Sequence, residues 1–223
     1  MTSDLAISAA LVVFAYLLGS VSPSVYLGMI FKKVDLRDHG SGNAGTTNAF
    51  RVLGVKLGIV VFLLDVGKGF LPVFLARTYT NPVTTVIVGA AAMAGHNWPV
   101  FLRFKGGKGV ATAAGGILAM SPLVFGSLIG SYVLVFLVTR IPSVGSLAAT
   151  LVYPTLTIAL GQPRPYMVFS VAAAAMVFWL HRRNIARIVK GKEPKAELPW
   201  KRVARARQGP RAAKATGKGS GGA

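Results

Sequence analysis

The chain contains no cysteine, and its 223 residues include only six acidic residues and three histidines. The missing cysteines exclude disulfide bonds, thiolate nucleophiles and cysteine-ligated metals. So few acids and histidines leave little material for a metal site, and we expect neither a metal nor a cofactor. Charged residues of either sign make up only 14% of the chain, against about 25% in a typical soluble domain. The composition therefore argues against a water-soluble globular protein.

Apolar residues and positive charge are both abundant. Hydrophobic residues make up 53% of the chain, and the mean hydropathy is +0.58. The same chain carries 25 lysine and arginine residues, which give it a formal net charge of +19. The apolar content excludes a disordered basic chain. We therefore predict an all-α integral membrane protein whose positive charge is concentrated in a few places.

A membrane-spanning helix needs about 20 predominantly apolar residues. Seven segments are predicted to span, although the third and fourth are short: 5–31, 57–76, 83–95, 110–120, 123–138, 144–160 and 166–180. Pro23 is expected to bend the first of them. A cleaved signal peptide is the alternative for this first segment, but Asp4 stands where a basic region would be expected. The segment 110–120 is either a full span or a re-entrant half-helix.

The distribution of basic residues predicts the orientation of these spans. With the N-terminus outside, the inner loops and the C-terminal region hold 22 of the 25 basic residues. The outer loops hold only Arg77 and Arg164, and Lys68 lies within a span. Cytoplasmic loops carry the excess of lysine and arginine in membrane proteins. We therefore predict seven transmembrane helices with the N-terminus outside and the C-terminus in the cytoplasm.

The composition changes near residue 198. Residues 1–197 form the predicted membrane domain, and residues 198–223 consist mainly of lysine, arginine, alanine and glycine. We expect the second segment to be a disordered cytoplasmic tail held near anionic lipid headgroups by its charge. No aromatic residue follows Trp200, which disfavours nucleic acid as a partner. The sequence indicates no obligate protein partner.

The first inner loop is rich in glycine and neutral donors. It runs from Gly40 to Asn48 and has three glycines within six residues, which lets the backbone N–H groups surround an anion. Side-chain donors lie in the same loop: Ser41, Asn43, Thr46, Thr47 and Asn48. Arg51 follows and has a planar guanidinium suited to phosphate. A flexible link between two helices is the simpler interpretation of this loop taken alone.

The second inner loop contains Gly-Gly-Lys-Gly, residues 106–109, directly before the predicted helix 110–120. Backbone amides and an ammonium group at the start of a helix favour phosphate binding. Lys108 is the predicted ligand, whereas Lys105 is either a ligand or only a positively charged residue of an inner loop. Trp98, Phe101 and Phe104 are predicted to lie in the membrane interface.

A third polar cluster follows the last span. His181 and Asn184 lie one helical turn apart and share a face, and Glu193 ends the cluster. Ser143 and Ser146 open the sixth span on the same side, where the simpler interpretation is a helix cap and close packing. The three clusters together predict a site for phosphate-bearing molecules at the inner leaflet. Since the chain offers no obvious Ser-His-Asp set, its chemistry would depend on positioning and charge stabilisation.

Two ionisable residues lie inside the second span. Asp65 and Lys68 are three residues apart and either neutralise one another structurally or take part in a proton relay. A transporter or channel for an organic phosphate is the alternative function for the whole chain. Such a protein would need polar residues in several spans, and only this pair lies in the middle of one. The sequence therefore favours an enzyme.

The three motifs closely resemble those of the bacterial acyl-phosphate:glycerol-3-phosphate acyltransferase family, PlsY. The resemblance covers roughly residues 5–193 and is carried by three stretches: 40–48 with Arg51, 95–112, and 181–193. It implies a multi-pass enzyme of the bacterial inner membrane with its active site on the cytoplasmic face. It further implies transfer of a fatty acyl group from acyl phosphate to the 1-position hydroxyl of glycerol 3-phosphate. Lysophosphatidic acid and phosphate would be the products, and acyl-CoA and acyl carrier protein would not be donors.

The resemblance also implies roles for individual residues. The implied catalytic residues are Ser41, Arg51, Lys108, His181 and Asn184. The implied substrate-binding residues are Gly40, Gly42, Asn43, Gly45, Thr47, Asn48, His96, Asn97, Lys105, Gly106, Gly107, Gly109, Ser143, Ser146 and Glu193. Either His181 or a phosphate oxygen of the donor removes the proton from the acceptor hydroxyl, and the sequence leaves both routes open.

Overall fold

The computed structural model describes residues 2–196, and these residues form helices and connecting turns without a β-strand. The predicted all-α class is therefore confirmed for this part of the chain. The ten α-helices are α1 (Thr2–Ser20), α2 (Pro23–Lys32), α3 (Thr46–Val52), α4 (Val55–Tyr79), α5 (Pro82–Asn97), α6 (Val110–Met120), α7 (Pro122–Thr139), α8 (Pro142–Ala159), α9 (Arg164–Leu180) and α10 (Arg182–Val189). Two short 3₁₀ turns are η1 (Leu36–Asp38) and η2 (Val100–Leu102). The predicted tail, residues 198–223, lies outside the described residues.

Six of the seven segments predicted to span coincide with one helix each, and the segment 5–31 contains two helices, α1 and α2. Four stretches are long and apolar enough to cross a membrane: Asp4–Lys32, Val55–Tyr79, Pro82–Leu102 and Pro122–Thr139. The helices α6 and α9 are apolar but shorter. Large apolar side chains on the outer faces of the bundle are exposed, which suits contact with lipid rather than water.

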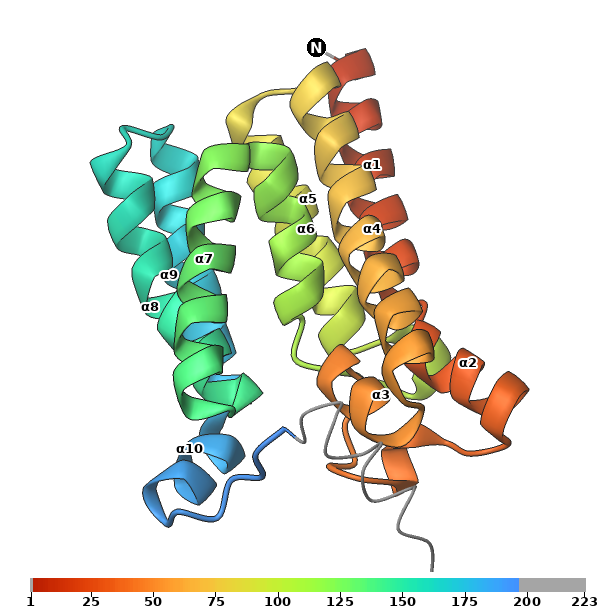
Figure 1. Cartoon of the computed structure of the whole chain (residues 1–223). Helices are drawn as coiled ribbons and strands as arrows, with labels where there is room; N and C mark the ends of the chain where they lie inside the picture. Colours follow the sequence, from red (N-terminus) through yellow and green to blue (C-terminus); the bar gives the residue numbers. More distant parts are fainter. Residues whose placement is uncertain (1, 197–223) are drawn as a thin grey trace, which may run out of the picture.

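The first predicted span is broken rather than bent. Helix α1 ends at Ser20, and α2 begins at Pro23 after an extended Ser22. A proline disfavours the helical conformation of the residue before it, which accounts for the interruption. The carbonyl oxygen of Val21 at the break accepts a hydrogen bond of 2.7 Å from Lys68 Nζ. Figure 1 shows α2 turning away from the direction of α1 at the lower end of the bundle.

The long helices form two groups that stand side by side. Helices α1, α4, α5 and α6 make up one group, and α7, α8 and α9 make up the other (Figure 1). Small residues allow the close approach of α4 to α6, because a Cβ atom at Gly69 would overlap the carbonyl oxygen of Thr112. The groups meet where α6 contacts α7 and α5 contacts α9.

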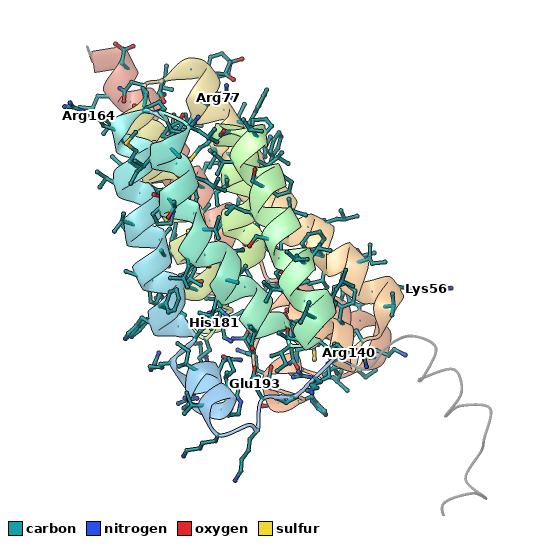
Figure 2. All side chains as sticks on the ribbon, turned by 60° about the vertical axis from the view of Figure 1, so that its left-hand side comes forward. Lys56, Arg77, Arg140, Arg164, His181 and Glu193 are labelled. Atoms are coloured by element: carbon teal, nitrogen blue, oxygen red, sulfur yellow. The ribbon has the colours of Figure 1, made fainter. Side chains whose placement is uncertain are left out.

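The alternating direction of the helices gathers the polar motifs at one end of the bundle. Figure 2 shows Arg77 and Arg164 at one end, whereas Arg140, His181 and Glu193 lie at the opposite end. The connections that carry the three motifs all leave the bundle at the second end. The loops predicted to bind phosphate are thus brought together by the fold.

Candidate active site

Lys108 and Asn184 connect the second and third motifs. Lys108 precedes the start of α6, and its Nζ donates a hydrogen bond to Asn184 Oδ1 on α10. Asn184 Nδ2 in turn donates to Glu193 Oε1 at 2.5 Å. The contact joins residues 76 positions apart in the chain and spans the two helix groups. Lys108 therefore belongs to the same cluster as the last motif.

The carboxylate of Glu193 organises the third motif. Ser143 Oγ at the start of α8 donates to Glu193 Oε1 at 2.8 Å, and Arg187 Nε lies 2.6 Å from Glu193 Oε2. Burial raises the pKa of Glu193, but hydrogen bonds from Arg187, Asn184 and Ser143 outweigh it, so the pKa lies below its ordinary value. Glu193 is therefore ionised at neutral pH, and its carboxylate connects α8 and α10 with the segment that follows α10.

Positive charge predominates around Lys108. Burial lowers the pKa of Lys108 to about 8, and the positive charges of Arg187 and Arg51 lower it further against the opposing effect of Glu193. The effect of Arg51 brings α3, and with it the first motif, within electrostatic range of Lys108. At neutral pH the lysine is mostly protonated. Two arginines and one carboxylate thus act on the charge of Lys108, and the excess of positive charge favours an anion.

His181 belongs to the same cluster, and its imidazole is neutral. Its side chain is buried, and Nδ1 is 2.8 Å from the carbonyl oxygen of Val177. Because a carbonyl only accepts, Nδ1 carries the hydrogen and Nε2 keeps its lone pair. Burial and the charge of Lys108 lower the pKa of His181 to about 4. Nε2 is therefore suited to accept a hydrogen bond from a hydroxyl group.

The side chain of Asn48 stabilises the conformation of the first motif through hydrogen bonds within the loop. Gly40 and Gly42 adopt positive φ angles of 63° and 69°, which glycine tolerates best. Asn48 Oδ1 accepts the N–H of Ser41 at 3.0 Å, and its Nδ2 donates to the carbonyls of Leu36 and His39. The side chain of Asn48 is buried and its amide is hydrogen-bonded within the loop, and its predicted contact with a substrate stays a prediction. Ser41 and Thr47 are exposed, and Asn43 is half-buried.

His96 and Asn97 support the second motif through buried contacts, and their predicted contact with a substrate stays a prediction. Both side chains are 5% exposed. The carbonyl oxygen of His96 accepts the N–H of Gly107 at 3.0 Å, and a Cβ atom at Gly107 would overlap the imidazole ring. Asn97 lies against Gly109, where a Cβ atom would come 2.7 Å from Asn97 Oδ1. The glycines of this motif are thus required for packing over α5.

Three further predicted residues are placed by the structure. Ser146 Oγ donates to the carbonyl oxygen of Pro142 at 3.1 Å within α8. Lys105 is exposed and lines a cavity of about 680 Å³ between the first and second motifs, together with Gly42 and Gly106. Gly45 precedes the first residue of α3, and a Cβ atom there would come 2.7 Å from Asn43 Oδ1. Lys108 and the third motif do not line this cavity.

Arg187 belongs to the cluster but is not among the site residues predicted from the sequence. It forms the ion pair with Glu193 and lowers the pKa of Lys108. Its distance of six residues from Glu193, across the turn at Gly191, is the signal that could have identified it.

Comparison with known proteins identifies relatives over most of the chain. The family model of glycerol-3-phosphate acyltransferase matches residues 9–191. A glycerol-3-phosphate acyltransferase of Geobacillus kaustophilus is 43% identical over 195 residues, which cover 87% of this chain and 99% of that protein. A glycerol-3-phosphate acyltransferase of Parasynechococcus marenigrum is 46% identical over 187 residues, which cover 83% of this chain and 88% of its own length.

Two crystal structures of PlsY (YgiH), an integral membrane glycerol 3-phosphate acyltransferase, have the same fold. The glycerol 3-phosphate form gives a TM-score of 0.83 at 38% identity, covering 85% of this chain and 96% of that one. The lysophosphatidic acid form gives a TM-score of 0.80 at 36% identity. The family match, the relatives and the shared membrane fold agree with the motifs gathered around Lys108. The chain therefore belongs to the glycerol-3-phosphate acyltransferase family.

Proposed function

We propose that this protein transfers a fatty acyl group from acyl phosphate to the sn-1 hydroxyl of glycerol 3-phosphate, an early step of phospholipid biosynthesis. The products are lysophosphatidic acid and inorganic phosphate. The observation that carries the proposal is the cluster around Lys108, in which Arg51, Arg187, Asn184 and Glu193 share one positively charged site. Both substrates carry a phosphate, and this site is suited to phosphate by charge and by donor geometry.

We further propose that seven helices cross the bacterial inner membrane, with the N-terminus outside and the active site at the cytoplasmic face. The support is the segregation of charge, because among residues 2–196 the loops and helix ends opposite to the motifs contain only Arg77 and Arg164 as basic residues (Figure 2). Acyl phosphate and lysophosphatidic acid both have an acyl chain that the membrane can hold. The polar reaction would then take place at the level of the headgroups.

The reaction needs no covalent enzyme intermediate. The acceptor hydroxyl oxygen attacks the carbonyl carbon of acyl phosphate, a carbon–oxygen bond forms, and the bond from that carbon to the phosphate oxygen breaks. Ser41, Arg51 and Lys108 would hold phosphate groups, while Ser143, Asn184 and Glu193 keep the site in shape. Negative charge moves to the leaving phosphate, so an ammonium group at Lys108 stabilises the transition state more than the ground state.

The acceptor proton goes to a phosphate oxygen of the donor in this proposal. His181 has a pKa of about 4, which makes it a weak base at neutral pH. A phosphate oxygen of the donor is more basic and lies next to the bond that breaks. His181 Nε2 would accept a hydrogen bond from the acceptor molecule and fix its orientation. No further proton carrier is needed to balance the reaction.

A comparison of donors tests the proposed function. Purified protein in detergent is given labelled glycerol 3-phosphate together with acyl phosphate, acyl-CoA or acylated acyl carrier protein, all with the same acyl chain. We expect labelled 1-acyl-glycerol 3-phosphate from acyl phosphate alone. Comparable product from either thioester would contradict the assignment of the donor, and a 2-acyl product would contradict the assignment of the position.

A further inference from the structure

A buried ionic pair lies in α4 next to the first two motifs, outside the reaction described above. The side chains of Asp65 and Lys68 are 1% and 5% exposed, and Lys68 Nζ lies 2.8 Å from Asp65 Oδ1. Burying two charges carries a large desolvation cost, and apolar residues of similar size often give equal or greater stability. The contacts of the pair therefore indicate what else it does.

Asp65 contacts the first motif directly. Thr46 is the first residue of α3, and its Oγ1 donates to Asp65 Oδ2 at 3.0 Å. Helix α3 has only seven residues, and Arg51 lies in its last turn. A bond at the first residue of so short a helix fixes the direction in which the helix presents Arg51. Asp65 thus anchors the element that carries a phosphate-binding residue.

The second motif reaches Asp65 through His96. His96 Nδ1 lies 3.4 Å from Asp65 Oδ1 and 3.1 Å from Thr112 Oγ1 near the start of α6. The His96 carbonyl accepts the N–H of Gly107, and its ring packs against that glycine. Lys108 is the next residue along the chain. The imidazole thus connects the Asp65 carboxylate with the turn that presents Lys108.

Lys68 extends the same network to α2. Its Nζ donates to the carbonyl oxygen of Val21 at the break between α1 and α2. Within α2, Ser24 Oγ donates to the carbonyl oxygen of Ala44 in the first motif at 2.8 Å. One buried pair therefore contacts the break before α2, the start of α3 and the end of α5.

We propose that Asp65 is a positioning residue that sets the Arg51 and Lys108 motifs relative to each other, through Thr46 and His96. The contacts of the pair with Thr46, His96 and the carbonyl of Val21 support a positioning role. The inference rests on the proposed function for its activity test, and a binding measurement makes it independent of the donor.

Threonine variants test the link between Asp65 and the first motif. Thr46→Val removes the donor while keeping the volume, and Thr46→Ser keeps the donor. Thr78→Val is the matched control, because Thr78 lies on α4 and its Oγ1 donates only to the Phe74 carbonyl of the same helix. We expect Thr46→Val to lower kcat/KM by about tenfold or more, as misplacement of catalytic groups does. Thr46→Ser and Thr78→Val should stay close to the unsubstituted protein, and equal activity of all three variants would overturn the proposal.

Neutralising the pair separates positioning from folding. Asp65→Asn alone leaves a buried ammonium unpaired, whereas Asp65→Asn with Lys68→Met removes both charges and is expected to restore the thermal unfolding temperature. The double variant still lacks the carboxylate that joins Thr46 and His96. We therefore expect its kcat/KM to remain about tenfold or more below that of the unsubstituted protein. Recovery of both stability and kcat/KM would show that the pair is only structural and would overturn the proposal.

A titration with inorganic phosphate keeps this test separate from the identity of the acyl donor. Phosphate binding at Arg51 and Lys108 raises the thermal unfolding temperature whether or not acyl phosphate is a substrate. We expect Thr46→Val and the double variant to need several times more phosphate for the same rise. An unchanged phosphate dependence in both would contradict the role of Asp65. Absence of acyl transfer in the unsubstituted protein would contradict the proposed donor instead.

Discussion

Opposing effects determine the pKa of Lys108. Glu193 stabilises its ammonium group, whereas burial, Arg187 and Arg51 destabilise it, so that its pKa is about 8. An incoming phosphate adds negative charge and shifts this balance toward the protonated lysine. In the proposed reaction, Lys108 would therefore bind phosphate most strongly in the protonated form, which also stabilises the leaving group.

Replacing Lys108 with alanine should remove a major part of the transition-state stabilisation. We expect Lys108→Ala to remove about 2–4 kcal/mol of transition-state stabilisation, as loss of one charge-stabilising donor does. This loss corresponds to a decrease in kcat/KM of roughly 30- to 1000-fold. Lys56→Ala is the control, because Lys56 is an exposed lysine at the same end of the bundle (Figure 2). Steady-state kinetics measure the difference, and an unimpaired Lys108→Ala enzyme would refute the assignment of Lys108 to phosphate.

The pKa of Lys108 predicts an alkaline limb in the pH profile. Since kcat/KM reports ionisations of the free enzyme, it should fall as the pH rises through about 8 and Lys108 loses its proton. Arginine stays protonated across this range, so the limb should disappear or move to higher pH in Lys108→Arg. A pH–rate profile with the same limb in both proteins would assign the ionisation to another group.

The low pKa of His181 predicts that the rate does not change near neutral pH through protonation of this histidine. Its imidazole should stay neutral throughout pH 6–8, because its pKa is about 4. We expect His181→Gln to leave the shape of the pH profile unchanged in this range and to lower turnover by less than about 100-fold. A general base contributes about 10²–10⁴-fold. A larger loss accompanied by a changed profile would favour the histidine as the base.

At this scale the sequence predicts residue types better than their contacts. The motifs identify Arg51, Lys108 and His181, and the structure places all three in one electrostatic cluster. Asn48 and His96 have the same donor capacity as true ligands, but the fold uses their atoms internally. The type of a residue determines which groups its side chain can bind, whereas the orientation of that side chain depends on tertiary packing.

The side chain of Glu193 connects helix α10 with the start of α8. Glu193 accepts hydrogen bonds from Ser143, Asn184 and Arg187, and thereby holds α10 against the start of α8. The low pKa of Glu193 means that its contribution to stability is present above its unfolded pKa of about 4.3 and is lost as the pH falls below that value.

Neutralising Glu193 should loosen α10 without removing a substrate ligand of the first two motifs. We expect Glu193→Gln to lower the free energy of unfolding by about 1–3 kcal/mol, because it leaves buried donors poorly paired. The acid-dependent loss of stability should become smaller in this variant. Thermal unfolding in detergent at pH 4 and pH 7 measures both effects, with Asp38→Asn, an exposed carboxylate of η1, as the control. Equal stability of the two variants would contradict the role of Glu193.

Long apolar helices are predicted well from the sequence, and short polar helices are not. The seven apolar segments all correspond to helices, because their length and hydropathy are sufficient signals. Pro23 indicates a bend but not the complete break, which is stabilised by Lys68 from α4. The sequence predicts only a glycine-rich loop where helix α3 begins, because the seven residues of this helix lack an apolar run. The helix depends instead on the hydrogen bond to Asp65 and on packing.

For the whole molecule, the proposed orientation in the membrane rests on the distribution of charge, and because the sequence has no cysteine, a single introduced cysteine can test it. We expect Gln162→Cys to react with a membrane-impermeant thiol reagent added to intact cells. Lys190→Cys should react only after the membrane is opened. Gln162 is partly exposed and Lys190 is exposed, and the two positions lie at opposite ends of the bundle. The reverse labelling pattern would contradict the proposed orientation.

The convergence of the motifs is predictable from topology, but their contacts are not. An alternating series of spans predicts that the three motifs share one face, as the structure shows for one end of the bundle (Figure 2). No sequence pattern predicts that Lys108 meets Asn184, because that contact depends on how the two helix groups pack against each other. The same applies to the network around Asp65, which joins segments from four parts of the chain.

The release of inorganic phosphate by purified protein tests the central claim most directly. The protein is supplied with acyl phosphate and glycerol 3-phosphate together, and with each substrate alone. We predict phosphate release only when both are present, with one lysophosphatidic acid formed for each phosphate released. Release from acyl phosphate at the same rate without glycerol 3-phosphate, or no release with both substrates, would contradict acyl transfer at the site around Lys108.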